Sequence, residues 1–192
     1  MKDNFIQSLQ QHVTLTEQEL AVIEELFNTR KYRKRQYILQ EGEVMRFDSF
    51  VLSGLTRLYE VDEKGHEHIV MFGPEGWWVG DLYSFFAETP SRFNIDCLED
   101  TEVMQISKEN LETLYSRVPK MERHFRILLQ NAYIASTARV TSSLIKSATE
   151  RYAEFIERYP DIEQRVPDHQ IASYLGITPQ SLSRIRAGRK ES

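Results

Sequence analysis

The chain has 192 residues, with 24 lysines and arginines against 29 aspartates and glutamates, and a net charge of −5. Its 41% hydrophobic and 28% charged residues are typical of a globular protein and exclude a disordered or fibrous chain. The single cysteine, Cys97, excludes an intramolecular disulfide and a cysteine-ligated zinc or iron–sulfur site within one chain. No apolar run reaches the ~18 residues of a membrane span, and no signal-peptide pattern opens the sequence. We therefore expect a cytoplasmic protein without a membrane partner.

The charge is distributed unevenly along the chain. Residues 1–116 hold 11 basic and 21 acidic side chains, whereas residues 117–147 hold six basic and one acidic. Within residues 165–190, five basic side chains accompany a single acidic one, Asp168. Because the N-terminal part is acidic and the C-terminal part is basic, we expect any contact with DNA to lie towards the C-terminus.

Residues 31–106 read as a β domain. Short apolar runs alternate there with glycine or charged turns, and the turn Asp62-Glu63-Lys64-Gly65 is typical of a hairpin. Many short strands at this spacing predict an all-β sandwich or barrel. Ahead of them, Thr16 followed by Glu19 predicts the capping box of a helix.

After residue 108 the pattern becomes helical, without glycine or proline between Pro119 and Pro160. We expect a long helix within residues 117–147 that associates with a second copy of the chain. The alternative is that its apolar stripe packs only on the β domain of its own chain. A break at Ser147-Ala148-Thr149-Glu150 predicts a further helix, capped by Thr149 or Ser147, that extends to Tyr159. The stripe recurs at three- and four-residue steps, as in a coiled coil, at Val118, Met121, Phe125, Leu128, Ala132 and Ala135.

Residues 166–186 carry the most specific pattern. Pro167 and Pro179 suit the first positions of two short helices, and Gly176 suits the left-handed turn that ends the first of them. Thr178 suits the N-cap of the second helix. Two short helices joined by a glycine turn predict a helix-turn-helix. The alternative is a helical hairpin with a polar outer face.

Leu182 and Ile185 are expected to face inward, which leaves polar side chains on the outer face of the second short helix. The chemistry of these side chains suits contact with DNA. Glutamine offers a paired donor and acceptor to adenine, and arginine a two-pronged donor to guanine. Hydroxyl groups and helix N-termini suit phosphate. We expect Gln180 and Arg184 to reach base edges, and the later arginines to meet phosphates. The predicted DNA-binding residues are His169, Thr178, Pro179, Gln180, Ser181, Ser183, Arg184, Arg186 and Arg189.

Four segments stand in a recognisable order and spacing: Glu41-Gly42-Glu43, Phe50-Val51-Leu52-Ser53-Gly54, Asp62-Glu63-Lys64-Gly65 and Gly76-Trp77-Trp78-Val79-Gly80-Asp81-Leu82. Together with the helix-turn-helix they make the chain, over roughly residues 17–187, similar to the Crp/Fnr family of bacterial transcription regulators. The resemblance implies an α+β protein with three parts. These are a cyclic-nucleotide-binding-like β-roll of jelly-roll-like double sheets at 1–116, a long dimerisation helix at 117–147, and a small helix-turn-helix DNA-binding domain at 148–192. The β-hairpin wing that family members carry after the recognition helix is expected to be absent.

The resemblance also implies a function. We expect a homodimer that binds a near-palindromic site on double-stranded DNA, with RNA polymerase as a further partner and no enzymatic activity. The competing interpretation is a ligand-binding signalling module whose helical tail contacts a protein; the basic face of residues 178–190 favours DNA. A β-barrel enzyme is the most distant interpretation, because its metal site needs a cluster of ligands, and His66 and His68 alone share a strand face. We expect neither a metal nor a cofactor.

The expected ligand position departs from the cyclic AMP binders of the family. Those resemble one another in a Gly-Glu-Leu, whose glutamate holds the ribose hydroxyl, and a later Arg-Ser pair, whose arginine pairs with the phosphate. Here the triplet is Gly80-Asp81-Leu82. Ser91 occupies the position of the arginine and Arg92 that of the serine. If this segment is a strand, Arg92 points to the face opposite that of Ser91. Ser136 and Thr137 fall where the family places hydroxyls against the adenine. Because the phosphate loses its main cation, we expect cyclic AMP not to be the effector.

Overall fold

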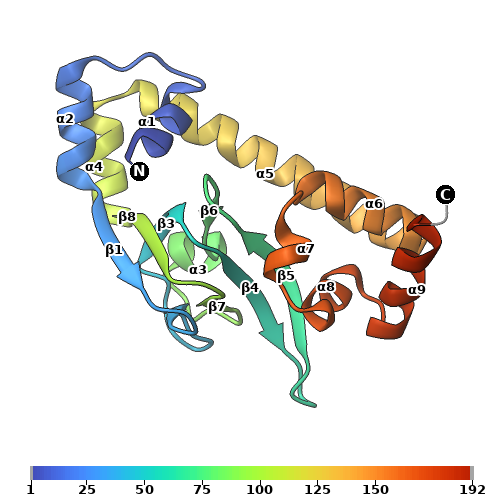
Figure 1. The fold of residues 1–192 in the computed structure, drawn as a ribbon. Coiled ribbons are helices and arrows are strands. Elements are labelled where there is room, and N and C mark those ends of the chain that lie inside the picture. The colour runs from blue at the N-terminus through green and yellow to red at the C-terminus, as the bar shows by residue number, and fades with distance from the viewer. Residues whose placement is uncertain (1, 191–192) are drawn as a thin grey trace. The chain divides into compact units, whose positions relative to one another are not determined.

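The computed structural model describes residues 2–190, and the side chains of residues 3–188 (Figure 1). It separates into two compact units, Met1–Glu60 with Met71–Gln130, and Val61–Val70 with Asn131–Ser192, which are described in turn. The helices are α1 (Lys2–Gln10), α2 (Glu17–Leu26), α3 (Leu82–Ala87), α4 (Lys108–Arg117), α5 (Lys120–Ile145), α6 (Ala148–Arg158), α7 (Ile162–Arg165), α8 (Asp168–Leu175) and α9 (Pro179–Lys190).

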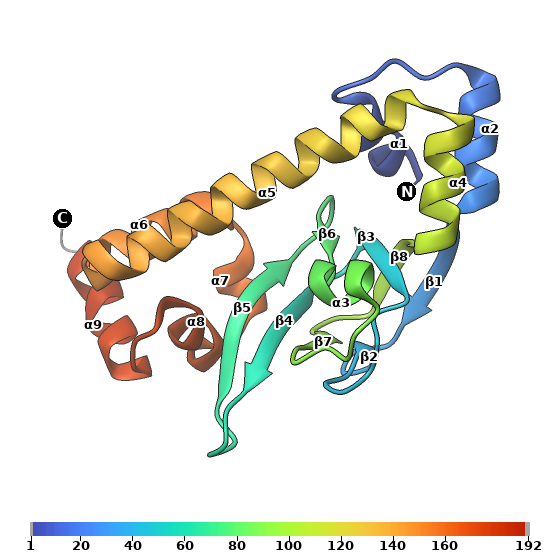
Figure 2. The ribbon, with the colours of Figure 1, turned by 180° about the vertical axis from the view of Figure 1, so that it is seen from behind.

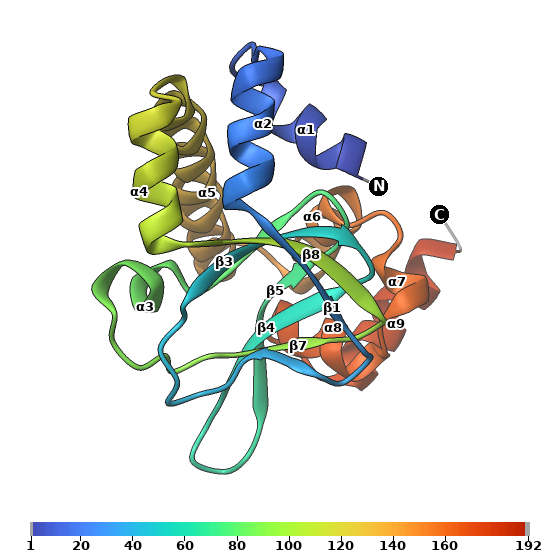
Figure 3. The ribbon, with the colours of Figure 1, turned by 90° about the vertical axis from the view of Figure 1, so that its left-hand side faces the viewer.

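The strands form the double sheet that the sequence predicts, and the α+β class is confirmed (Figure 3). One sheet has the order β1-β8-β3-β6 and the other the order β2-β7-β4-β5, with antiparallel neighbours such as β3 and β8. The turn after β3 requires its glycine: Gly54 has a φ of +91°, and a Cβ there would lie 2.4 Å from the carbonyl oxygen of Asp100. The strands are β1 (Asn28–Tyr32), β2 (Tyr37–Leu39), β3 (Phe47–Ser53), β4 (Thr56–Val61), β5 (Glu67–Gly73), β6 (Trp78–Val79), β7 (Asn94–Cys97) and β8 (Thr101–Ser107).

Helices close the core of the first unit. The predicted capping box at the start of α2 is confirmed, with Thr16 and Glu19 bonded reciprocally. Helix α2 lies beside α4 (Figure 1). Helix α1, which the sequence analysis does not predict, buries Phe5 in an aromatic cluster, with ring centroids 4.9 Å from Phe27 and 5.2 Å from Phe50. Burial of aromatic rings of this size is a main source of core stability.

The predicted apolar stripe begins at Val118, the C-cap residue of α4, continues along α5 and divides into two parts. Val118 and Met121 are fully buried and Phe125 is 6% exposed, with its ring centroid 5.3 Å from that of Trp78. For these residues the alternative holds: they pack within the first unit, and their assignment to a seam between two copies is wrong. A side chain that is already buried has little surface left to contribute to a dimer. Further along α5 the apolar side chains are exposed, at Leu129, Tyr133, Ile134, Val140, Leu144 and Ile145.

The second unit contains the hairpin tip 61–70, the later turns of α5, and helices α6 to α9. The predicted break before α6 is confirmed, because Ser147 caps this helix in a capping box with Glu150. Helix α6 ends at Arg158, with Tyr159 as its C-cap residue. Its buried face contributes Tyr152 and Phe155 to the core.

Two buried titratable groups of the first unit have pKa values that differ from their ordinary values. His124 is 1% exposed, and burial, together with the neighbouring His12, lowers its pKa to about 4. The two imidazole rings lie with centroids 5.5 Å apart. Asp48 is also buried, and burial raises the pKa of its carboxyl to about 7, although a hydrogen bond from the Ser49 N–H opposes this rise.

We expect the two groups to act in opposite directions between pH 4 and pH 6.5. The unfolded chain binds a proton at His124 more readily than the folded chain does, so this residue costs stability as the pH falls from 6.5 to 4. Asp48 has a raised folded-state pKa, so its contribution is lost as the pH rises from about 4 to 7. Asp48→Asn should therefore give a free energy of unfolding that rises more steeply with pH than the wild type, and His124→Phe one that rises less steeply. The expected changes are at most about 3 kcal/mol across the window.

Urea unfolding at four pH values between 4 and 7 measures both slopes. Circular dichroism on the same samples reports whether each variant is folded. Identical pH slopes in the wild type and both variants would contradict the assignment of these two groups.

Candidate nucleic-acid interface and ligand position

Helices α8 and α9 form the predicted helix-turn-helix (Figure 2). Gly176 ends α8 in the left-handed conformation, with a φ of +65°. Thr178 caps α9, because its Oγ1 accepts a hydrogen bond from the Ser181 N–H at 3.2 Å. Pro179 is the first residue of α9, as predicted, whereas Pro167 is the N-cap of α8 rather than its first helical residue. These local signals fix the turn between the two helices.

The faces of α9 are separated as the sequence predicts. Leu182 is buried and Ile185 half-buried, so this side of the helix faces the protein. Gln180 and Arg184 are exposed and four residues apart, which places them on one face of the helix. The hydroxyl of Ser181 is half-buried, 3.0 Å from that of Thr178. The other exposed members of the predicted set are Thr178, Pro179 and Ser183, with His169 at the start of α8.

Arg186 and Arg189 are the arginines that the sequence predicts to contact phosphate. The side chain of Arg189 lies outside the described residues. The guanidinium of Arg186 contacts the protein itself, with Nε 2.8 Å from Glu163 and an Nη 2.6 Å from Asp168. Reaching a phosphate would require Arg186 to break both ion pairs, so the geometry does not favour the predicted phosphate contact.

The expected ligand position is filled by contacts within the chain. Asp81 is the N-cap of α3, and one of its carboxylate oxygens accepts the N–H groups of Tyr83 and Ser84, at 3.1 and 3.2 Å. The other oxygen accepts the hydroxyl of Ser91 at 2.7 Å. Asp81 and Ser91 are both buried. The carboxylate and the residue at the arginine position therefore bond to each other.

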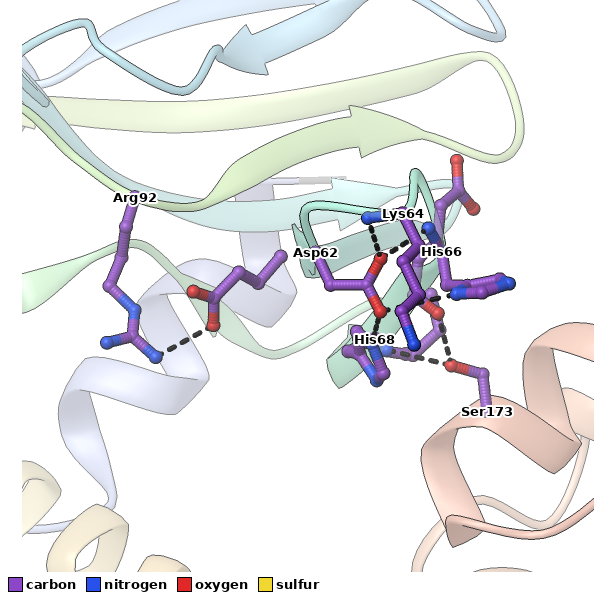
Figure 4. Close-up of polar contacts among 9 residues, drawn as sticks. Asp62, Lys64, His66, His68, Arg92 and Ser173 are labelled. Atoms are coloured by element: carbon purple, nitrogen blue, oxygen red, sulfur yellow. Dashed lines mark hydrogen bonds and ion pairs between the residues drawn. The ribbon is translucent and has the colours of Figure 1, made fainter.

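The remaining predicted ligand residues of the first unit do not bond to the side chains of Asp81 and Ser91 in the described structure. Arg92 has a side chain that is 70% exposed and that pairs with Glu60 at 2.7 Å (Figure 4). Gly80 adjoins the pair but is tightly enclosed, because a Cβ there would lie 2.7 Å from Asp48 Oδ1. Leu82, the first residue of α3, is half-buried. The predicted hydroxyl residues, Ser136 and Thr137, are exposed on α5 in the second unit.

Helix α5 also carries a surface in the second unit. A groove of about 400 Å³ runs along the exposed part of this helix, where apolar and small side chains meet. Positions 134, 137, 141 and 145 are three or four residues apart and form a stripe of their own, offset around the helix from the stripe that ends at Ala135. The lining residues are Tyr133, Ile134, Thr137, Ala138, Thr141, Ser142 and Lys146.

Of the alternating histidines, His66 lies in the hairpin turn after β4 and His68 lies in β5. The carboxylate of Asp62 lies 3.3 Å from the His66 Nδ1 and 3.0 Å from the His68 Nε2, and it also accepts the Lys64 N–H (Figure 4). These hydrogen bonds, first that of His68, hold the pKa of Asp62 well below its usual range. In the part of the chain that the structure describes, no three or more His, Cys, Asp or Glu side chains are grouped to bind a metal ion. The same hairpin meets α8, because the Ser173 hydroxyl donates to the Glu67 carbonyl at 2.6 Å.

Comparisons with known proteins agree with this arrangement. Residues 29–118 match the family described as the cyclic nucleotide-binding domain. Over 186 residues the chain is 26% identical to the fumarate and nitrate reduction regulatory protein of Vibrio cholerae, covering 90% of this chain and 73% of the relative. It is 27% identical to regulatory protein HlyX of Actinobacillus pleuropneumoniae, covering 90% of this chain and 76% of the relative.

Solved structures share the fold at lower identity. FixK2 from Bradyrhizobium japonicum superposes with a TM-score of 0.73 at 20% identity, over 84% of this chain and 83% of that chain. The catabolite activator protein of Thermus thermophilus gives a TM-score of 0.61 at 20% identity, over 96% of this chain and 87% of that chain. Between residues 2 and 190, no helix is long and apolar enough to cross a membrane.

The fold and the family match define the class of residues 29–118, a domain of the cyclic nucleotide-binding type. Over most of its length the chain is similar to transcriptional regulators of the Crp/Fnr family, the resemblance that its motifs indicate.

Proposed function

We propose that the chain is a sequence-specific DNA-binding regulator that acts in the cytoplasm as a homodimer on a palindromic site, and not an enzyme. The observation that carries the proposal is the exposed polar face of α9, held in a helix-turn-helix. Gln180 and Arg184 share that face, and their side chains have the donor and acceptor geometry for base edges. Thr178 and the N-terminus of α9 are suited to the DNA backbone.

The exposed apolar face of α5 supports the homodimer. Tyr133 is 73% exposed, and Ile134, Leu144 and Ile145 are exposed on the same helix. Thr137 and Thr141 lie between them, so that positions 134, 137, 141 and 145 follow at the three- and four-residue steps of helices that pack side by side. A two-fold dimer would present two copies of α9 to neighbouring turns of DNA, about 34 Å apart, and so would favour a palindrome.

Selection of binding sites from random DNA tests the proposed function. We expect enrichment of a palindromic sequence whose half-sites are about one helical turn apart. Failure to bind any DNA above background at low salt would overturn the proposal. It would favour the alternative, a signalling module whose helical tail contacts a protein partner.

RNA polymerase is a proposed further partner, since regulators of transcription act on that enzyme directly or by excluding it from DNA. Transcription in vitro from a promoter that carries the selected site tests this partner. A change in transcript yield that depends on the bound chain supports it, and an unchanged yield at saturated DNA contradicts it.

We also propose that cyclic AMP is not the effector. In the family's cyclic AMP binders an arginine pairs with the phosphate, but here Ser91 is buried and bonded to Asp81. Arg92 pairs with Glu60 on the exposed side. A buried phosphate without a cation loses charge-assisted hydrogen bonds of about 1.5–3 kcal/mol each.

Calorimetric titration with cyclic AMP should therefore give no binding heat at micromolar concentrations. Arg92→Ala is the matched variant and should behave as the wild type does. Micromolar binding by the wild type that Arg92→Ala abolishes would contradict the prediction and would assign Arg92 to the phosphate.

A further inference from the structure

Arg186 contacts one side chain from each of three other helices in the second unit. Its Nε lies 2.8 Å from Glu163 Oε1 on α7 and 3.3 Å from the hydroxyl of Tyr152 on α6. One Nη lies 2.6 Å from Asp168 Oδ1 on α8. Tyr152 in turn donates its hydroxyl to Glu163. The guanidinium thus joins α9 to α6, α7 and α8 through a single network.

The chemistry of this network suits an arginine in particular. The Arg186 side chain is 24% exposed, and its planar fork meets two carboxylates in different directions. Burial lowers the pKa of Arg186, but the hydrogen bonds with Asp168 and Tyr152 outweigh it and raise that pKa above its ordinary value. Arg186 is therefore charged, and with its two carboxylate partners the group carries a net charge of about −1, which does not attract phosphate.

Helix geometry places the network away from the reading face of α9. At about 100° per residue, Arg186 lies about 200° around the helix from Arg184 and about 240° from Gln180. It shares its side with Leu182, four residues earlier, which is buried. One face of α9 is therefore anchored to the protein, and the opposite face is presented to solvent.

We propose that Arg186 is a positioning residue, which sets the orientation of α9 and so aligns Gln180 and Arg184 with base edges, rather than a phosphate contact. The inference rests on the proposed DNA-binding function. Small displacements of a recognition element weaken directional hydrogen bonds to bases more than they weaken attraction to phosphates, which has little directional requirement. Loss of the anchor should therefore reduce discrimination between sequences.

Two variants separate positioning from phosphate contact. Arg186→Gln removes the guanidinium, whereas Glu163→Gln keeps Arg186 and removes one of its carboxylate partners. Each variant is first checked for folding by circular dichroism. Binding is then measured on the selected site and on single-base variants of it, at several salt concentrations.

We expect both variants to lose about tenfold in discrimination between the selected site and its single-base variants, while the dependence of log affinity on log salt keeps its slope. If Arg186 contacts a phosphate, Arg186→Gln should instead reduce that slope by about one unit. In that case Glu163→Gln, which frees Arg186, should strengthen binding to every sequence. Either of these results would overturn the proposal.

Amide hydrogen exchange in the DNA-free protein keeps the test independent of the proposed function. Loss of the anchor should speed exchange along α9 in Arg186→Gln, with exchange in the β-roll unchanged. Arg186→Lys keeps the charge but not the fork, and should speed exchange in α9 as well. Exchange in α9 equal to that of the wild type would contradict the positioning role even if the chain bound no DNA, whereas failure to bind DNA alone would contradict only the proposed function.

Discussion

Replacing Arg184 with alanine is expected to weaken binding to the selected DNA site by about 1–3 kcal/mol and to relax discrimination at one base pair. Arg184 is exposed on α9, on the face that it shares with Gln180. Its fork of donors matches the two acceptors of guanine, so the loss should be confined to the sequence that carries that base. Binding measured on every single-base variant of the site gives the discrimination directly.

Arg189→Ala is the matched control for this prediction. Because Arg189 lies at the end of α9, we expect it to contact phosphate. Its loss should weaken binding to all sequences alike and lower the slope of log affinity against log salt by about one unit. If Arg184→Ala instead lowers the affinity for every sequence by the same factor, Arg184 does not read a base.

Charges on the exposed face of α5 should convert the proposed dimer to a monomer. Ile134 and Leu144 are exposed, and the double variant Ile134→Glu, Leu144→Glu would place four carboxylates in the seam of a dimer. An unpaired charge in such a seam costs several kcal/mol, so the dissociation constant should rise by at least about a hundredfold. Sedimentation velocity across a range of concentrations measures the change.

Tyr83→Glu controls for the effect of a charge on an exposed aromatic position. Tyr83 is exposed on α3 in the first unit, and its replacement should leave the dimer unchanged. A double variant of α5 that sediments as the wild-type dimer would contradict the proposed seam. Phe125 is unsuitable for this test, because it is buried within the first unit and its replacement would lower stability instead.

Local rules made part of the fold predictable from sequence. The caps at Thr16, Ser147 and Thr178, and the left-handed turn at Gly176, follow from side chains within three or four residues of each helix end. The same rules located the helix-turn-helix and the exposed side of α9. They did not find α1, whose ordering depends on packing Phe5 against distant residues.

The stripe of α5 shows why periodicity alone is insufficient. Burial inside one chain and burial between two chains produce the same three- and four-residue steps. Only the structure separates Phe125, which packs on Trp78, from Tyr133, which is exposed. The predicted stripe therefore includes side chains that are buried within one chain, and the exposed apolar side chains begin one or two turns further along α5.

The contacts that the sequence analysis missed at the site join residues far apart in the chain. Arg186 meets Tyr152, 34 residues earlier, and Asp168, 18 residues earlier, so no local pattern distinguishes it from an exposed arginine. Asp81 and Ser91 are ten residues apart and bond because α3 folds back between them. The chemical character of these side chains is known from the sequence, but whether they face a ligand or each other depends on the tertiary structure.

The most direct test of the central claim is a titration of the wild-type chain with the selected palindrome, a single half-site and a scrambled duplex. The proposed function predicts two chains per palindrome and an affinity at least about a thousandfold above that for the scrambled duplex, with log affinity falling linearly with log salt. The half-site should bind more weakly than the palindrome, because only one α9 can reach its bases. Equal affinity for all three duplexes, or no binding at low salt, would contradict the claim.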